Sequence, residues 1–374
     1  MKLHLFIFFM LVICGVTVGQ VSSNYTIQHN GIAREYRVYV PSIYDGSTAV
    51  PLVFNLHGYT SDNVSQEFYG DFRPIADTAN FILVHPNGTF DQSNNRWWNA
   101  FDVPGVDDVG FISTLIDEVS GSYNIDGNCI YSTGMSNGGF MSYELACTLG
   151  HRIAAVASVT GTMTLNKLGS CNPIKPTPAL QIHGTLDPTV PYNGNAQYGA
   201  IEDVVDFWVN QTGSNPIPQF TAVPNVNTTD GCTAEHYVYL GGQNNSSVEF
   251  YKVISGGHTW PGAPVTIGTT NQDFDASVEI WRFFRKYKLD DLLDVSEFQT
   301  VELNLYPNPS EGSVFVETNV PWDVLNVVDL TGRIVRSIAN YSETVLIEGL
   351  DTGVYAVQIE IGNTKTTKKL VVQI

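Results

Sequence analysis

Gly134-Met135-Ser136-Asn137-Gly138-Gly139 lies between an apolar run at 128–133, typical of a buried strand, and a run at 140–149 typical of a helix. Glycines around a serine in this setting are typical of a nucleophile elbow, a strand-to-helix turn that leaves little room for side chains. Such a turn presents the serine Oγ and aims the next backbone N–H at developing negative charge. The stretch therefore predicts Ser136 as a nucleophile, the alternative being an ordinary glycine-rich turn.

The surrounding chain alternates strand-forming and helix-forming runs. A hairpin at 24–40, turning at Asn30-Gly31, comes first. Strands are expected at 51–56, 81–85, 130–134, 154–159, 179–183 and 248–254, and helices at 66–79, 109–123, 139–149, 200–210 and 275–287. This order predicts an α/β fold with a mostly parallel sheet, covered on both faces, and a ligand site at the carboxyl ends of the strands.

A nucleophilic serine needs a neighbouring base, and the base needs a carboxylate that fixes its tautomer. In α/β-hydrolases these groups follow in the order Ser, Asp or Glu, His. His258 follows the strand at 248–254 on a glycine-flanked loop, and Asp187 follows the strand at 179–183, so both are expected beside Ser136. Less suitable positions are held by His151, His183, His236, Asp203, Asp206 and Asp230. Of these, His183 is expected to orient the Asp187 loop.

An oxyanion hole needs two backbone donors. Asn137 N–H, directly after the nucleophile, is the first. The second is expected on the loop after the strand at 51–56, where Gly58 lets the backbone approach a ligand; Tyr59 N–H is preferred and Thr60 N–H is the alternative. His57 is expected to be structural.

Two tryptophans lie close to these motifs in the sequence. Trp260 follows His258 by two residues, and Trp98 belongs to an aromatic cluster at 96–99, so both are predicted to bind substrate, although tryptophans are more often simply packed. The loops at 91–102 and 262–271 are expected to shape the pocket. Asp107-Asp108 is most simply an N-cap pair at the start of a helix.

Composition and the N-terminus indicate an exported globular protein. The net charge of −19 argues against nucleic acid or an anionic membrane surface as a partner. Residues 1–19 have the basic start, apolar centre and small-residue end of a signal peptide. Four cysteines follow, which in an exported chain predicts two disulfides with three possible pairings. They are Cys129, Cys147, Cys171 and Cys232.

The pattern of strand-forming and helix-forming runs ends near residue 290. Residues 290–300 are predicted to form a linker, and 301–374 contain short alternating segments separated by turns. This pattern predicts a small all-β, immunoglobulin-like sandwich. With the signal peptide removed, residues 20–289 form the α/β domain.

Five stretches together resemble the secreted polyhydroxybutyrate-depolymerase-like esterases, which include feruloyl and acetylxylan esterases. They are Leu56-His57-Gly58, residues 106–112, Gly134 to Gly139, residues 182–188 and residues 256–262. The resemblance covers about residues 30 to 290 and implies an α/β-hydrolase that uses Ser136, Asp187 and His258. Residues 305–309, 329–333, 350–355 and 368–372 resemble the sorting domain of the type IX secretion system of Bacteroidetes, which implies outer-membrane export. A polysaccharide-binding sandwich is the alternative for this domain.

The hypothesis that follows is a secreted serine esterase with no cofactor and no metal, acting on esters linked to plant polysaccharide or on polyesters. Its partners would be that substrate and the secretion machinery, with no membrane span. A non-catalytic polysaccharide- or polyester-binding surface protein on a hydrolase scaffold is one alternative. A serine peptidase, which would use the same triad, is the other.

Overall fold

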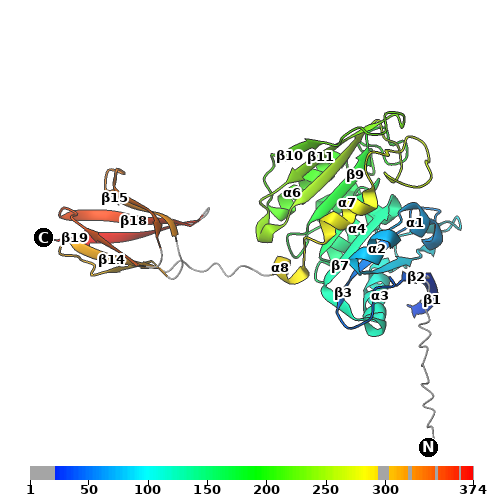
Figure 1. Cartoon of the computed structure of the whole chain (residues 1–374), viewed down its shortest axis with the longest axis horizontal. Coiled ribbons are helices and arrows are strands. Elements are labelled where there is room, and N and C mark those ends of the chain that lie inside the picture. The colour runs from blue at the N-terminus through cyan, green and yellow to red at the C-terminus, as the bar shows by residue number, and fades with distance from the viewer. Residues whose placement is uncertain (1–21, 294–302, 319–321, 342–343, 362–363, 374) are drawn as a thin grey trace, which may run out of the picture. The chain divides into compact units, whose positions relative to one another are not determined.

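The computed structural model describes residues 22–293, 303–318, 322–341, 344–361 and 364–373 (Figure 1). Contacts divide the chain into two compact units, 1–294 and 295–374. The predicted signal peptide at 1–19 lies outside the described residues, as does most of the predicted linker. The first linker residues instead end helix α8 (Leu289–Leu293).

Unit 1 is built on a ten-stranded sheet, counted over the described residues. Its strands, in spatial order, are β1 (Ser22–His29), β2 (Ile32–Tyr39), β4 (Ile82–Pro86), β3 (Val50–Leu56), β7 (Ile125–Met135), β8 (Ala155–Val159), β9 (Ala179–Gly184), β12 (Val248–Ile254), β11 (Thr233–Tyr239) and β10 (Gln219–Ala222). The strands from β4 to β12 pair in parallel, and both edges are antiparallel. The predicted α/β class with a mostly parallel sheet is confirmed.

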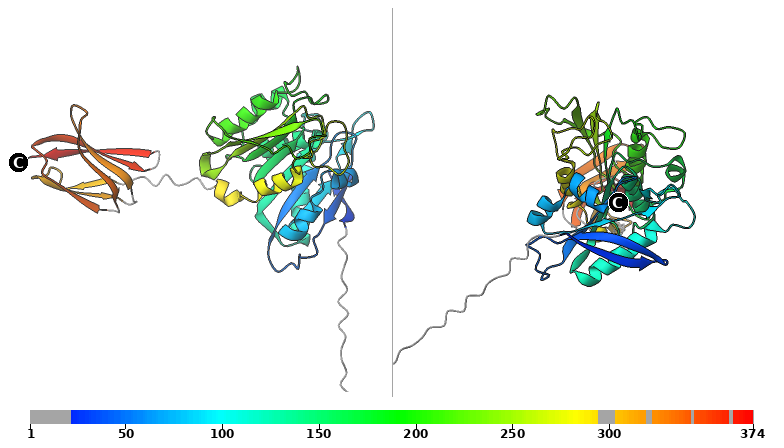
Figure 2. Two further views of the ribbon diagram at one scale, coloured as in Figure 1. Left: turned by 45° about the horizontal axis from the view of Figure 1, so that its top comes forward. Right: turned by 90° about the vertical axis from the view of Figure 1, so that its right-hand side faces the viewer.

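Helices cover both faces of this sheet (Figures 1 and 2). One apolar core lies under α3 (Asp108–Ser122), α4 (Asn137–Thr148) and α6 (Ile201–Thr212). The other lies under α2 (Arg73–Ala79), α7 (Ala276–Phe284) and α8. Strand residues alternate between the two cores, as Leu52 and Val53 do, because successive side chains point to opposite faces.

Local departures from the predicted elements have local causes. The helix expected at 66–79 is two helices, α1 (Asn63–Tyr69) and α2, because Gly70 caps the first and Pro74 lies in the first turn of the second. Strands β10 and β11 were not predicted; β10 is an exposed edge strand and lacks an apolar pattern. The remaining short elements are β5 (Thr89–Phe90), β6 (Arg96–Trp97), α5 (Leu165–Ser170) and the 3₁₀ turn η1 (Gln243–Asn245).

The prediction of two disulfides was wrong. One bond joins Cys147, at the end of α4, to Cys171, directly after α5. Cys129 and Cys232 are free, and both are buried. Burial raises the pKa of each of these thiols to about 11, so they stay protonated. Cys129 lies within β7 and Cys232 directly precedes β11, so the positions that the fold gives them do not bring the sulfurs together.

Unit 2 is an all-β sandwich, as predicted. One sheet contains β13 (Leu303–Tyr306), β14 (Ser313–Thr318) and β17 (Thr344–Glu348). The other contains β16 (Ile334–Tyr341), β15 (Trp322–Asp329), β18 (Gly353–Ile361) and β19 (Thr364–Val372). Their inner faces share one apolar core that includes Val316, Leu325 and Val357. In the described part of the chain, no helix combines the length and apolar character needed to cross a bilayer.

Candidate active site

Ser136 lies at the turn between β7 and α4 with φ 53° and ψ −118°, a left-handed conformation that a non-glycine residue rarely adopts. The neighbouring glycines are sterically required. A Cβ on Gly138 would lie 2.2 Å from the Leu56 carbonyl oxygen, and one on Gly134 would lie 2.6 Å from the same oxygen. The tight turn expected from the sequence is therefore packed directly against the end of β3.

Asp187 and His258 meet on neighbouring loops, after β9 and β12. His258 Nδ1 lies 2.7 Å from Asp187 Oδ2. Asp187 Oδ1 accepts the backbone N–H groups of Thr189 and Val190, both at 2.8 Å. Burial works against ionisation of Asp187, but the hydrogen bond and charge of His258 outweigh it and lower the carboxyl pKa. The ionised carboxylate holds the imidazole with its Nδ1–H toward Asp187 and leaves Nε2 free to accept a proton.

His183 supports the Asp187 loop. Its Nδ1 accepts a hydrogen bond from Gln181 Nε2 at 3.1 Å, so its proton is on Nε2, which donates to the Val190 carbonyl at 2.9 Å. The same Nε2 is 3.4 Å from Asp187 Oδ2. Burial lowers the pKa of His183 to about 4, so the ring is neutral at pH 7. This geometry fits the expectation that His183 orients the loop.

The two oxyanion alternatives differ in one hydrogen bond. Thr60 N–H donates to the Arg96 carbonyl at 2.9 Å and is therefore engaged. Within the described residues, Tyr59 N–H meets no acceptor. Asn137 is the first residue of α4, so its N–H has no partner inside the helix. The free donors beside Ser136 are thus those of Asn137 and Tyr59.

A cavity of ≈ 410 Å³ opens over Ser136 and His258. It is lined by Gly58, Tyr59, Ser61, Ser65, Gln66, Phe68, Tyr69, Met135, Ser136, His258, Val265 and Ile267. One wall of the cavity is apolar and half-exposed: Phe68 is 51% exposed, Val265 48% and Ile267 60%. The loop at 262–271 thus contributes to the pocket as expected. Phe68 and Tyr69 also line the cavity and were not predicted, because no local motif links them to the nucleophile turn.

Neither tryptophan predicted to bind substrate lines this cavity. Trp260 is 1% exposed, packs edge-on against Phe72 and donates from Nε1 to Ser277 Oγ at 3.2 Å. Trp98 is fully buried, and its Nε1 donates to the His57 carbonyl at 3.0 Å. Both rings lie behind the site because they fill the core under its loops, which sequence proximity alone does not reveal.

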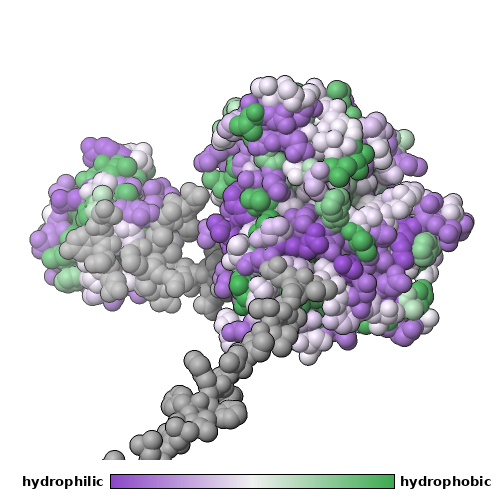
Figure 3. Space-filling model, turned by 45° about the vertical axis from the view of Figure 1, so that its right-hand side comes forward, coloured by the Kyte–Doolittle hydropathy of each residue, from purple (hydrophilic) through white to green (hydrophobic). Residues whose placement is uncertain are grey.

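Other predicted polar residues lie elsewhere. His236 Nε2 on β11 lies 2.8 Å from Oε2 of the buried Glu249 on the neighbouring strand β12. His57 is buried and bonded to backbone, which fits its expected structural role. Figure 3 shows small apolar patches among hydrophilic residues on the face in view, the usual composition of a folded domain's surface.

The fold is that of an α/β-hydrolase, and one cavity is lined by both Ser136 and His258. Residues 43–201 match the family described as phospholipase/carboxylesterase, and residues 304–373 match the secretion system C-terminal sorting domain. The resemblance to esterases and to a sorting domain is thereby confirmed.

Individual relatives agree with these matches. The chain is 27% identical over 274 residues to feruloyl esterase D of Neurospora crassa, covering 70% of this chain and 85% of that one. It is 33% identical over 177 residues to a probable feruloyl esterase C of Aspergillus niger, covering 46% of this chain but only 60% of that relative. The structure of an acetyl xylan esterase from Aspergillus awamori shares the fold at a TM-score of 0.52 and 14% identity, covering 70% of this chain and 99% of that one.

Proposed function

We propose that this protein is an exported carboxylic ester hydrolase that forms an acyl-enzyme on Ser136. The observation that carries the proposal is that Ser136 shares a cavity with His258, whose other ring nitrogen is held by Asp187 at 2.7 Å. The similarity to feruloyl and acetylxylan esterases supports the reaction class. The match to a sorting domain supports export to the cell surface or beyond, with residues 1–19 as the proposed signal peptide.

The reaction follows from the positions of these groups. Ser136 Oγ attacks the ester carbonyl carbon while its proton passes to His258 Nε2, and the oxyanion is bound by the N–H groups of Asn137 and Tyr59. The C–O bond to the alcohol then breaks, and His258 returns the proton to the leaving oxygen. Water attacks the acyl-enzyme with His258 again as base, releasing the acid and restoring Ser136.

The cavity favours an acyl group larger than acetyl. Its wall of Phe68, Val265 and Ile267 is apolar, and its aromatic side chains Tyr59 and Tyr69 suit a flat ring. We therefore place aromatic acyl esters, as the feruloyl relatives suggest, ahead of acetyl esters and hydroxybutyrate polymers. Initial rates on methyl ferulate, acetylated xylan and polyhydroxybutyrate test this order; a preference for either polymer would reverse it.

Replacing the nucleophile tests the reaction itself. Ser136→Ala is expected to lower p-nitrophenyl acetate turnover by about 10⁶-fold and to abolish fluorophosphonate labelling. Ser132→Ala, a buried serine on the same strand bonded to Ser142, is the matched control and should retain both. Turnover by Ser136→Ala within about a hundredfold of the native rate would refute the assignment, since the oxyanion donors alone account for only a small residual activity. An unlabelled but folded native protein would favour the binding scaffold, and cleavage of amides alongside esters would favour a peptidase.

A further inference from the structure

Trp98 lies between the two segments that carry the free oxyanion donors. Its backbone N–H donates to Asn137 Oδ1 at 2.6 Å, and Asn137 Nδ2 donates back to the Trp98 carbonyl at 3.0 Å. Its indole Nε1 donates in the other direction, to the His57 carbonyl at 3.0 Å. One buried residue therefore joins the start of α4 to the loop after β3.

The second segment has a fixed peptide plane. His57 Nε2 accepts Gly88 N–H at 2.9 Å, so the ring proton is on Nδ1, which donates to the Gly58 carbonyl at 2.7 Å. Ser61 N–H donates to that carbonyl as well. Because a trans peptide directs its C=O and N–H to opposite sides, holding Gly58 C=O inward turns Tyr59 N–H outward. The neutral His57 ring thus sets the direction of the second donor.

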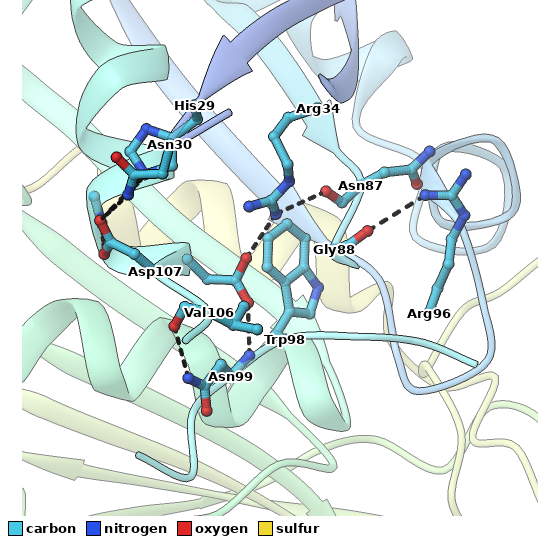
Figure 4. A network of polar contacts seen from close by, with 12 residues as sticks. His29, Asn30, Arg34, Asn87, Gly88, Arg96, Trp98, Asn99, Val106 and Asp107 are labelled. Carbon is cyan, nitrogen blue, oxygen red and sulfur yellow. Dashed lines mark hydrogen bonds and ion pairs between the residues drawn. The ribbon is translucent and has the colours of Figure 1, made fainter. Parts of the chain in front are cut away.

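A buried ion pair between Arg34 and Asp108 holds the backbone of Asn99, the residue after Trp98 (Figure 4). Asp108 Oδ2 accepts the N–H of Asn99, the next residue in the chain, at 2.7 Å. Asp108 Oδ1 lies 2.6 Å from Arg34, which also donates to the Asn87 carbonyl at 3.1 Å. Asp107 caps α3 through Gly110 N–H, as expected, whereas Asp108 does not cap the helix. The Asp107-Asp108 motif therefore has two separate roles.

We propose that Trp98 is a positioning residue for the oxyanion hole, tied to Asn137 on one side and His57 on the other and anchored by the Arg34–Asp108 pair. The inference rests on the proposed ester hydrolysis. An oxyanion hole acts through donors already aimed at the charge that develops. Loosening Trp98 therefore costs transition-state stabilisation and leaves binding of the ground state unchanged.

Trp98→Phe tests this in the full chain, because it removes the indole N–H and keeps an aromatic ring. The matched control is Trp208→Phe, since Trp208 is also fully buried but its Nε1 has no hydrogen-bond partner among the described residues. With p-nitrophenyl acetate and active sites counted by fluorophosphonate end-point titration, Trp98→Phe is expected to lower kcat at least about tenfold with KM within about twofold. Affinity for a trifluoromethyl ketone, which forms a tetrahedral adduct, should fall by the same factor.

The control separates positioning from packing. Trp208→Phe should leave kcat per active site and ketone affinity unchanged even where it lowers the melting temperature. If Trp98→Phe does not fold, Asn137→Ala removes the side-chain clamp and keeps the backbone donor, and the same loss is expected. Unchanged kcat and ketone affinity in the folded variant would overturn the inference. It would leave the proposed function intact, because that depends on the result with Ser136→Ala.

Discussion

Burial controls the protonation of several basic side chains in unit 1. His57, His85 and His183 are buried, and burial lowers the pKa of each to about 4. Lys175 is 5% exposed, and burial lowers its pKa to about 7. Its Nζ donates to the Ala154 carbonyl at 3.2 Å and lies 3.3 Å from Thr177 Oγ1. No acid compensates its charge in these contacts, so its protonation works against folding.

Lys175→Met is expected to stabilise the protein at pH 7. The lysine pKa is about 7 in the folded chain and about 10.4 unfolded, so native stability falls as pH drops from about 10 to 7 and is level below. Titration alone gives about 4 kcal/mol at pH 7; after a discount of about 2 kcal/mol for the lost hydrogen bonds, the gain should be about 2 kcal/mol at pH 7, reach zero near pH 9 and become a small loss at pH 10. Urea unfolding at several pH values measures it. A gain that does not change with pH would show that Lys175 titrates normally.

At the scale of elements, Glu249 joins β12 to α7 and β11. Its fully buried carboxylate contacts His236 at 2.8 Å and Lys286 at 2.6 Å, and it also pairs with Arg282. Burial alone would raise its pKa, but hydrogen bonds from His236, Arg282 and Lys286 prevail and lower it to about 2. The carboxylate therefore stabilises the fold when it is ionised.

Glu249→Gln is expected to lower the free energy of unfolding at pH 7 by about 3 kcal/mol. The native pKa lies below the unfolded value of about 4.3, so this stability is complete above that pH and is lost as pH falls towards 2. The difference between variant and native protein should therefore shrink to less than half at pH 3. Denaturant curves at both pH values test this, and an equal difference at pH 3 and pH 7 would contradict it.

The Cys147–Cys171 bond ties α4 to the end of α5. With a sequence separation of 24, it should stabilise the fold by about 3 kcal/mol, chiefly by restricting the unfolded chain. Replacing both cysteines by alanine should lower the unfolding free energy by that amount. Cys129→Ala, which removes a buried thiol and no disulfide, is the comparison. Equal losses in the two proteins would show that packing, and not the cross-link, accounts for the effect.

At the scale of the whole molecule, the two units have separate apolar cores. Helix α8 belongs to unit 1, because Leu289 and Leu292 are buried in its core and Asn244 Nδ2 donates to the Leu292 carbonyl at 3.0 Å. The boundary between the units therefore follows α8, a few residues beyond the predicted domain end at 289.

A chain ending at residue 293 is expected to keep kcat/KM on p-nitrophenyl acetate within about twofold, since every residue of the candidate site lies in unit 1. A chain ending at residue 287 loses two buried leucines, so its free energy of unfolding should fall by about 2 kcal/mol or more and its melting temperature should fall with it. Thermal melts and activity assays on both chains check this. Loss of activity in the longer chain would show that unit 2 contributes to the site.

Much of the fold and of the candidate site was predictable because it depends on short-range patterns. The central strands and most helices follow from alternating apolar periodicity, and the expected positions of Asp187 and His258 follow from strand ends that meet at one sheet edge. Edge strand β10 was not predictable in this way because it is exposed. The contact surface that Phe68 forms with the expected loop at 262–271 was not predictable, because Phe68 is distant from that loop in sequence and meets it only through folding.

The sequence by itself indicated the turn at Ser136, through glycines placed between a strand and a helix, and it set the order of serine, acid and histidine along the chain. The contact that makes those glycines necessary, with the Leu56 carbonyl oxygen at the end of β3, is tertiary. Only the tertiary structure decided which donor beside the serine is free, because Thr60 N–H is taken by Arg96, a residue far along the chain. It also decided that the buried Trp98 indole bonds the His57 carbonyl and that Asp108 bonds the backbone N–H of Asn99. Local patterns fix backbone shape, whereas hydrogen-bond partners depend on which distant segments pack together.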